Sequence, residues 1–190
     1  MKYPNSRLSL LIRSFCIPVA ILVVLAQVKA ADNLSIKLEI GRALDKGVTW
    51  LNGEQNSSSG HWGVSEYPAL TGLALRATLG HPESTMVVRF AKNQKTGFDF
   101  LMSKVQSDGG IYGKGLASYN TSICMMALLQ AKDAKYEETI RKARKFLINQ
   151  QADFDKKGEL DNTFDGGVGY GSSWAHSDLS NTHLAMEALY

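Results

Sequence analysis

One pattern occurs three times along this chain, and it constrains the fold more than any other feature of the sequence. Each copy begins with an amphipathic stretch that ends shortly before a glutamine, continues through a glycine-rich turn with an aromatic residue, and closes with an apolar stretch of helical periodicity. The three glutamines are Gln55, Gln106 and Gln151, and the turn aromatics are Trp62, Tyr112 and Tyr170. The repetition predicts a chain built from stacked copies of one helix pair.

The last stretch of each copy predicts a helix, over residues 68–79, 119–131 and 180–190. Pro68 suits a first helical turn, and the run Gly80-His81-Pro82 ends the first of these helices. No segment of useful length alternates between apolar and polar residues as a strand would. We therefore expect an all-α fold without a sheet.

The first thirty residues differ in composition from the rest. Basic residues precede the uncharged run 16–26, and Val28-Lys29-Ala30 presents small or apolar residues at the two positions that a signal peptidase reads. A membrane anchor is the alternative, but it needs about 20 apolar residues, which is more than this run provides. We expect residues 1–30 to be a signal peptide cleaved near Ala30, and residues 31–190 to form a domain in the periplasm or outside the cell.

Charge and cysteine content limit the partners of that domain. The net charge is +3, but residues 1–30 hold four of the 21 basic residues and no acidic one, which leaves 17 bases against 18 acids. This balance predicts no nucleic-acid partner. Cys124 alone would remain after cleavage, so no internal disulfide is possible, and its apolar neighbours indicate a buried thiol rather than a nucleophile.

The first copy carries the most specific motif. Trp50, Gln55 and Trp62 stand in the order Lys-Gly-x-x-Trp-Leu-x3-Gln-x4-Gly-x-Trp, which resembles the QW motif of squalene-hopene and oxidosqualene cyclases. The second copy has one extra residue before Gln106, and the third has a long insertion after Gln151. Residues 31–190 therefore resemble the prenyltransferase and squalene-cyclase repeat superfamily. The segments 165–171 and 178–182 are similar to exported bacterial members of that group with no settled activity.

The resemblance implies an α/α toroid, of which three helix pairs are visible here. It also implies that the glutamine amides stack on the aromatic rings and bond to backbone groups of the next helix. The residues with this structural role would be Trp50, Gln55, Trp62, Gln106, Tyr112, Gln151 and Tyr170. Because closed toroids of this family have more helix pairs, we expect the chain to be incomplete at its C-terminus. The remaining repeats or a second copy would complete the ring.

The resemblance also points to a candidate site. Cyclases of this family protonate their substrate with an acid of an Asp-x-Asp-Asp motif, and Asp178 matches the first position, whereas Ser180 and Asn181 replace the next two acids. Asp178 is therefore the candidate catalytic residue, and Trp174 and His176 of the same turn are candidate ligand-binding residues. The alternative is that Asp178 caps the following helix and His176 points to solvent.

Three function classes stay open. The first is an enzyme of the terpene-cyclase or prenyl-transfer type, acting on an isoprenoid or another apolar small molecule. The second is a non-catalytic toroid that binds a ligand or a protein partner. The third is a carbohydrate-active toroid, which would use paired carboxylates from the acidic stretch at Asp153, Asp155, Glu159, Asp161 and Asp165. No cofactor and no metal are expected, because the histidines have no paired spacing and Cys124 has no acidic partner nearby.

Overall fold

The computed structural model describes residues 33–154, 163, 165–171 and 174–190, with the side chains of residues 174–175 left out. The chain divides into two units, residues 1–46 and 47–190, and each is described by itself. The boundary falls within a helical stretch over residues 33–53. The predicted signal peptide, residues 1–30, lies outside the described residues.

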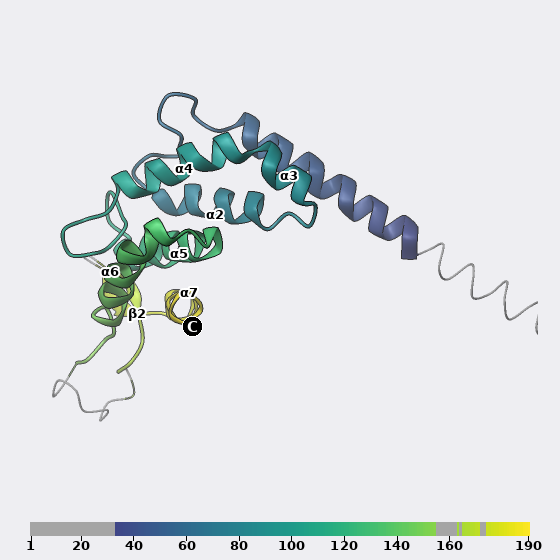
Figure 1. Ribbon diagram of the computed structural model, residues 1–190. Coiled ribbons are helices and arrows are strands. Elements are labelled where there is room, and N and C mark those ends of the chain that lie inside the picture. Colours follow the sequence, from purple (N-terminus) through teal and green to yellow (C-terminus); the bar gives the residue numbers. More distant parts are fainter. Residues whose placement is uncertain (1–32, 155–162, 164, 172–173) are drawn as a thin grey trace, which may run out of the picture. The chain divides into compact units, whose positions relative to one another are not determined.

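The second unit is mostly helical, as the sequence predicted (Figure 1). The predicted helices over 68–79, 119–131 and 180–190 correspond to α2, α5 and α7 and differ from them by at most two residues at either end. The helices are α2 (Pro68–Leu79), α3 (Ser84–Arg89), α4 (Ala91–Ser103), α5 (Ala117–Ala131), the 3-10 turn η1 (Ala134–Tyr136), α6 (Glu137–Ile148) and α7 (Leu179–Leu189).

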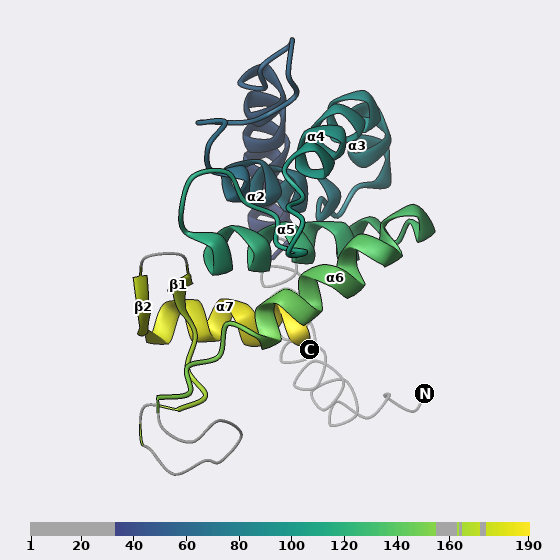
Figure 2. The same ribbon diagram turned by 90° about the vertical axis from the view of Figure 1, so that its left-hand side faces the viewer.

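These helices pack in two layers. α5 lies between α2 and α7, while α4 packs against α2, and α6 packs against α5 and α7 (Figure 2). At their beginnings, Ala69 of α2 donates its N–H to Asn120 Oδ1 of α5 at 3.0 Å. At their ends, Gln130 of α5 donates to the carbonyl of Arg76 at 3.2 Å. α2 and α5 therefore run in the same direction.

The core forms where the two layers meet. α5 is buried on most of its circumference, from Ala117 to Leu128 apart from Tyr119, because it has helices on several sides. The most deeply buried large apolar side chains of the described residues are Leu75, Leu101, Ile111, Ile123, Met125, Leu128 and Leu147. Burying a side chain of this size stabilises the fold by about 1.5–3 kcal/mol relative to leaving it in water. Packing against neighbouring helices thus stabilises this central helix.

A repeated turn precedes α2, α5 and α7. Its first element is a glycine in the left-handed backbone region, with φ of 76° at Gly60, 91° at Gly109 and 82° at Gly166. The glycine N–H donates to the carbonyl of Asn56, Gln106 or Ala152, and that residue's own N–H donates back to the carbonyl of His61, Gly110 or Gly167. The repeat found in the sequence is therefore a repeat of backbone hydrogen bonds.

Each turn is then tied to the helix that follows it. The N–H groups of Trp62, Ile111 and Val168 donate to the hydroxyls of Thr71, Thr121 and Thr182, at 3.0, 2.9 and 2.9 Å respectively. In each repeat, a threonine near the start of the helix thus accepts a hydrogen bond from the equivalent backbone N–H of the turn. A buried N–H without an acceptor costs about 1–3 kcal/mol, which explains the recurrence.

These bonds correct the alignment of the repeats. Ile111 and Val168, rather than Tyr112 and Tyr170, occupy the place of Trp62. Gln106 is also shifted by one position relative to Gln55 and Gln151, because it takes the place of Asn56 and Ala152 in the turn. Gln55 and Gln151 each donate to the carbonyl of their turn glycine, at 2.7 and 3.3 Å, whereas Gln106 donates to the Tyr112 carbonyl at 2.7 Å. The alignment of Tyr112 and Tyr170 with Trp62 was wrong because the repeated feature is the set of backbone hydrogen bonds and not the aromatic side chain.

A short hairpin corrects the expectation of a fold without a sheet. β1 (Gly169–Gly171) pairs antiparallel with β2 (Trp174–Ser177) just before α7. Gly171 lies against α5 so closely that an added Cβ would come within 2.9 Å of the Ser118 backbone nitrogen. Strands of three and four residues are too short to show alternation, which is why the sequence pattern missed them.

Candidate functional site

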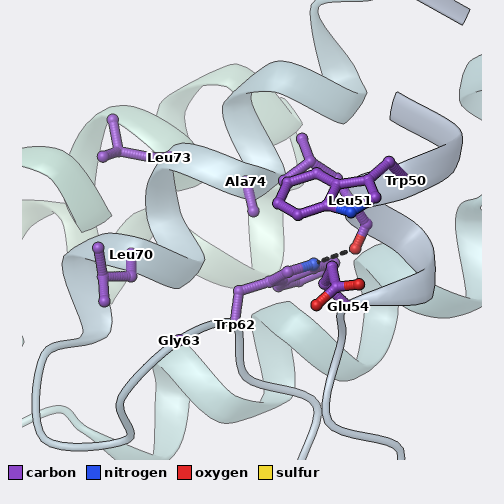
Figure 3. A pocket seen from close by; sticks show the side chains of 8 residues that line it. All are labelled: Trp50, Leu51, Glu54, Trp62, Gly63, Leu70, Leu73 and Ala74. Carbon is purple, nitrogen blue, oxygen red and sulfur yellow. Dashed lines mark hydrogen bonds between the residues drawn. The ribbon is translucent and has the colours of Figure 1, made fainter. Parts of the chain in front are cut away.

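A groove of about 600 Å³ lies in the second unit (Figure 3). The helical stretch ending at residue 53 contributes Trp50 and Leu51, and Glu54 follows directly. The first repeated turn contributes Trp62 and Gly63, and α2 contributes Leu70, Leu73 and Ala74. Six of these eight residues carry apolar side chains, which is typical of small-molecule sites.

Trp62 forms the fixed wall of the groove. Its indole Nε1 donates to the Leu51 carbonyl at 2.5 Å, and its backbone N–H donates to Thr71 Oγ1. Its ring lies on the α4 backbone at Gly97, where an added Cβ would come within 2.8 Å of the ring. The side chain is 4% exposed. Trp62 is therefore held rigidly, and its only donor is already used.

The rest of the apolar lining is open to solvent. Trp50 is 63% exposed, Leu70 is 40% exposed and Leu73 is 44% exposed. These two leucines lie on α2, and Leu75 of the same helix is completely buried. Exposed aromatic and aliphatic side chains that line one groove indicate a binding surface more than scattered surface residues do.

Glu54 is the one charged residue among the eight that line the groove. Figure 3 shows its carboxylate beside the Trp62 ring, at the opposite end of the groove from Leu70. Its side chain is exposed and follows Trp50 by one helical turn, so both belong to the same side of the segment. The groove consequently has an apolar end and an acidic end.

The sequence predicts a structural role for Trp50, Gln55 and Trp62. The hydrogen bonds of Gln55 join separate parts of the fold, as such a role requires. Its amide donates to the backbone carbonyls of Gly60 and Asn93 at 2.7 and 2.9 Å and to Thr96 Oγ1 at 3.1 Å. Asn93 and Thr96 lie on α4, so Gln55 links the first turn to the next helix pair. The groove beside the two tryptophans was missed, since exposure of α2 depends on what packs beside it.

Asp178, the candidate catalytic residue, is the N-cap of α7. Its Oδ1 accepts the Asn181 backbone N–H at 2.9 Å and its Oδ2 accepts the Asn181 side-chain amide at 2.6 Å. Burial alone would raise the pKa of Asp178, but the hydrogen bonds from Asn181 and Ser180 and the charge of His176 together lower it. Both oxygens are engaged and the ionised form is favoured, so the geometry agrees with the capping alternative.

The structure describes the other two candidates of this turn only in part. His176 is exposed in β2 and lies close enough to Asp178 to act on its charge. The backbone of Trp174 pairs with Gly171 in the hairpin, and its side chain lies outside the description. The hairpin therefore brings His176 and Asp178 together, on a different part of the chain from the residues that line the groove.

Among the described residues, the remaining sequence candidates form no second site. Of the acidic stretch, Asp153 and Asp165 are described and Asp155, Glu159 and Asp161 lie outside the described residues; Asp165 accepts the Phe154 N–H at 3.0 Å. Cys124 is buried, and burial raises the pKa of its thiol. Within the described part of the chain, no group of three or more His, Cys, Asp and Glu is arranged to hold a metal ion.

No protein-family model, no curated protein and no solved structure matches this chain. None of the helices in the described residues combines the length and apolar character that a membrane crossing requires. The groove and its lining are thus the main structural basis for a functional proposal.

Proposed function

We propose that residues 47–190 are part of an α/α toroid of the prenyltransferase and squalene-cyclase type, and that the protein binds an isoprenoid or another apolar chain. The observation that carries the proposal is the groove of about 600 Å³ with its six apolar side chains. Removing apolar ligand surface from water contributes about 25 cal/mol per Å², so such a lining supplies affinity without further polar contacts.

Two further features support a toroid. α2, α5 and α7 form one layer with α4 and α6 packed over it, and the first two helices of that layer run in the same direction. The turns that precede α2, α5 and α7 repeat in their backbone bonds. Stacked helix pairs with equivalent turns are the construction principle of helical repeat proteins. The composition of residues 1–30 supports export of the protein.

The proposed activity is binding rather than turnover. A general acid has to hold a proton at working pH, and the hydrogen bonds to Asp178 favour its ionised form. The groove is lined by Trp50, Trp62 and the α2 leucines, not by Asp178. A non-catalytic binding module fits these observations better than a cyclase that uses Asp178.

The test is a fluorescence titration with farnesol as an uncharged isoprenoid probe. In a Trp174→Phe background, Trp50 and Trp62 are the two tryptophans that remain of the three in the sequence. Farnesol should shift and quench their emission in a saturable manner, since one of the rings is largely exposed before binding.

A pair of matched leucines provides the control. Leu73 lines the groove and Leu129 on α5 does not, yet both are 44% exposed. Leu73→Asp should weaken farnesol binding at least tenfold, because it places a charge against the apolar lining, while Leu129→Asp should leave the affinity within twofold of the parent. Equal effects of the two substitutions, or no saturable signal, would contradict the proposal.

A further inference from the structure

We propose that the groove selects amphiphiles whose polar end is a cation, such as a quaternary or primary ammonium group. This inference rests on the proposed binding of an apolar chain and names the class of head group that the same site accepts. It follows from the side chains at the acidic end of the groove, at Glu54, Trp50 and Trp62.

The polar side-chain groups of the lining are the Glu54 carboxylate and the indole N–H groups of Trp50 and Trp62. Glu54 offers carboxylate oxygens, which accept hydrogen bonds and attract positive charge. The indole N–H of Trp62 is committed to the Leu51 carbonyl at 2.5 Å. Glu54 is thus the one charged group of the lining that a ligand head group meets at this end, and its negative charge favours a cation.

Aromatic surface adds to the same preference. The face of an indole carries partial negative charge and attracts a cation that lies within about 6 Å of the ring centre. Trp50 is 63% exposed, so a face of its ring is open to a ligand. Figure 3 shows the Trp50 and Trp62 rings at the end of the groove where Glu54 lies. A carboxylate beside indole rings is an arrangement suited to an ammonium group.

Leu70 and Leu73 complete the site for an amphiphile. They lie toward the other end of the groove, where an aliphatic tail would cover their exposed surface (Figure 3). A carboxylate or diphosphate head group attached to the same tail would meet Glu54 at the acidic end and be repelled. The inference thus separates this groove from a site built for prenyl diphosphates.

Three probes with the same tail test the inference on the full chain. Decyltrimethylammonium, decanol and decanoate carry a cationic, an uncharged and an anionic head group on an unbranched alkyl chain. Each is titrated below its micellar concentration or solubility limit by calorimetry and by tryptophan fluorescence. The cation should bind about threefold to tenfold more tightly than the alcohol, and decanoate should bind most weakly. The difference between cation and alcohol should shrink as salt is added, because the carboxylate is exposed.

Two substitutions assign the preference to named groups. Glu54→Gln removes the charge and Trp50→Leu removes the ring, and each should bring the affinity of the cation close to that of the alcohol. Glu83→Gln serves as a matched control, since Glu83 is also exposed and its side chain makes no capping bond. Because Glu54 and Trp50 are both exposed, neither change threatens folding, and thermal melting verifies this.

The outcomes separate the two proposals. Equal affinity for the three probes, or a cation preference that survives both Glu54→Gln and Trp50→Leu, would overturn the inference and leave apolar-chain binding in place. Failure of the three probes and of farnesol to bind would overturn the proposed function, and the head-group inference with it.

Discussion

The guanidinium of Arg76 in α2 lies 2.8 Å from the carboxylate of Glu187 in α7, although α5 stands between these two helices. The same guanidinium contacts Met126 Sδ of α5 at 3.3 Å. One side chain therefore connects all three helices of the layer, and joins residues that are 111 positions apart in the sequence.

We expect this ion pair to contribute little to stability despite its position. The two side chains are 33% and 43% exposed, so water and salt screen the attraction. A double-mutant cycle with Arg76→Ala and Glu187→Ala should give a coupling of about 0.2–1 kcal/mol, falling as salt is added. A coupling above about 2 kcal/mol would mean that the pair is desolvated and that α7 depends on it.

Gly109→Ala should destabilise the fold by at least about 2 kcal/mol. The substitution forces a residue with a Cβ into φ of 91°, and that Cβ would lie 2.8 Å from the Lys142 carbonyl oxygen of α6. Gly115→Ala is the control, because Gly115 has φ of 64° and no atom within 4 Å of its added Cβ. Urea unfolding should show a clearly smaller loss for Gly115→Ala; equal losses would contradict the packing argument.

Thr121→Val should cost about 1–3 kcal/mol of unfolding free energy. Valine keeps the shape of the side chain and leaves the buried Ile111 N–H without its acceptor. Thr121→Ser retains the hydroxyl and should recover most of the loss. If chemical denaturation finds valine as stable as threonine, the repeated turn-to-helix bond has no energetic role.

Asp178→Ala should lower stability by about 1 kcal/mol, since it removes the cap of α7. Ligand binding should stay unchanged, because Asp178 does not line the groove. Asp178→Asn keeps an oxygen acceptor and should lose less. Because the pKa of Asp178 is lowered on folding, its contribution is complete above the unfolded pKa and is lost as the pH falls through the folded pKa. Loss of binding with an unchanged melting temperature would instead support a functional Asp178.

Tyr112 should make stability sensitive to alkaline pH. The hydrogen bond from its hydroxyl to Asp108, 2.7 Å long, together with burial and the negative charge of Asp108, raises the pKa of Tyr112 to about 12. A raised pKa favours the protonated phenol in the folded state, so the contribution is present below about pH 10 and is lost toward pH 12. Tyr112→Phe should remove this step from the pH dependence of thermal unfolding; an unchanged profile would contradict the assignment.

Helices could be predicted where residues that begin and end a helix mark them, as Pro68 in the first turn and Gly80 at the end do for α2. α2 was predicted from residue 68 to 79 and observed with those limits. The register of the turns was not predictable, since it depends on φ at Gly109 and on the bond from Ile111 to Thr121, and neither is visible in side-chain type. The groove was missed for a related reason: Leu73 is periodic whether or not a helix covers it.

The parallel course of α2 and α5 has an electrostatic consequence. Neighbouring helices of an antiparallel bundle place opposite ends of their dipoles side by side, whereas parallel neighbours align like ends and repel each other weakly. Caps at these amino-terminal ends therefore have to offset more unfavourable charge than in a bundle. Asn120 does this across the helix interface, by accepting the Ala69 N–H of α2. An asparagine of one helix thus satisfies a free N–H group at the amino-terminal end of its neighbour.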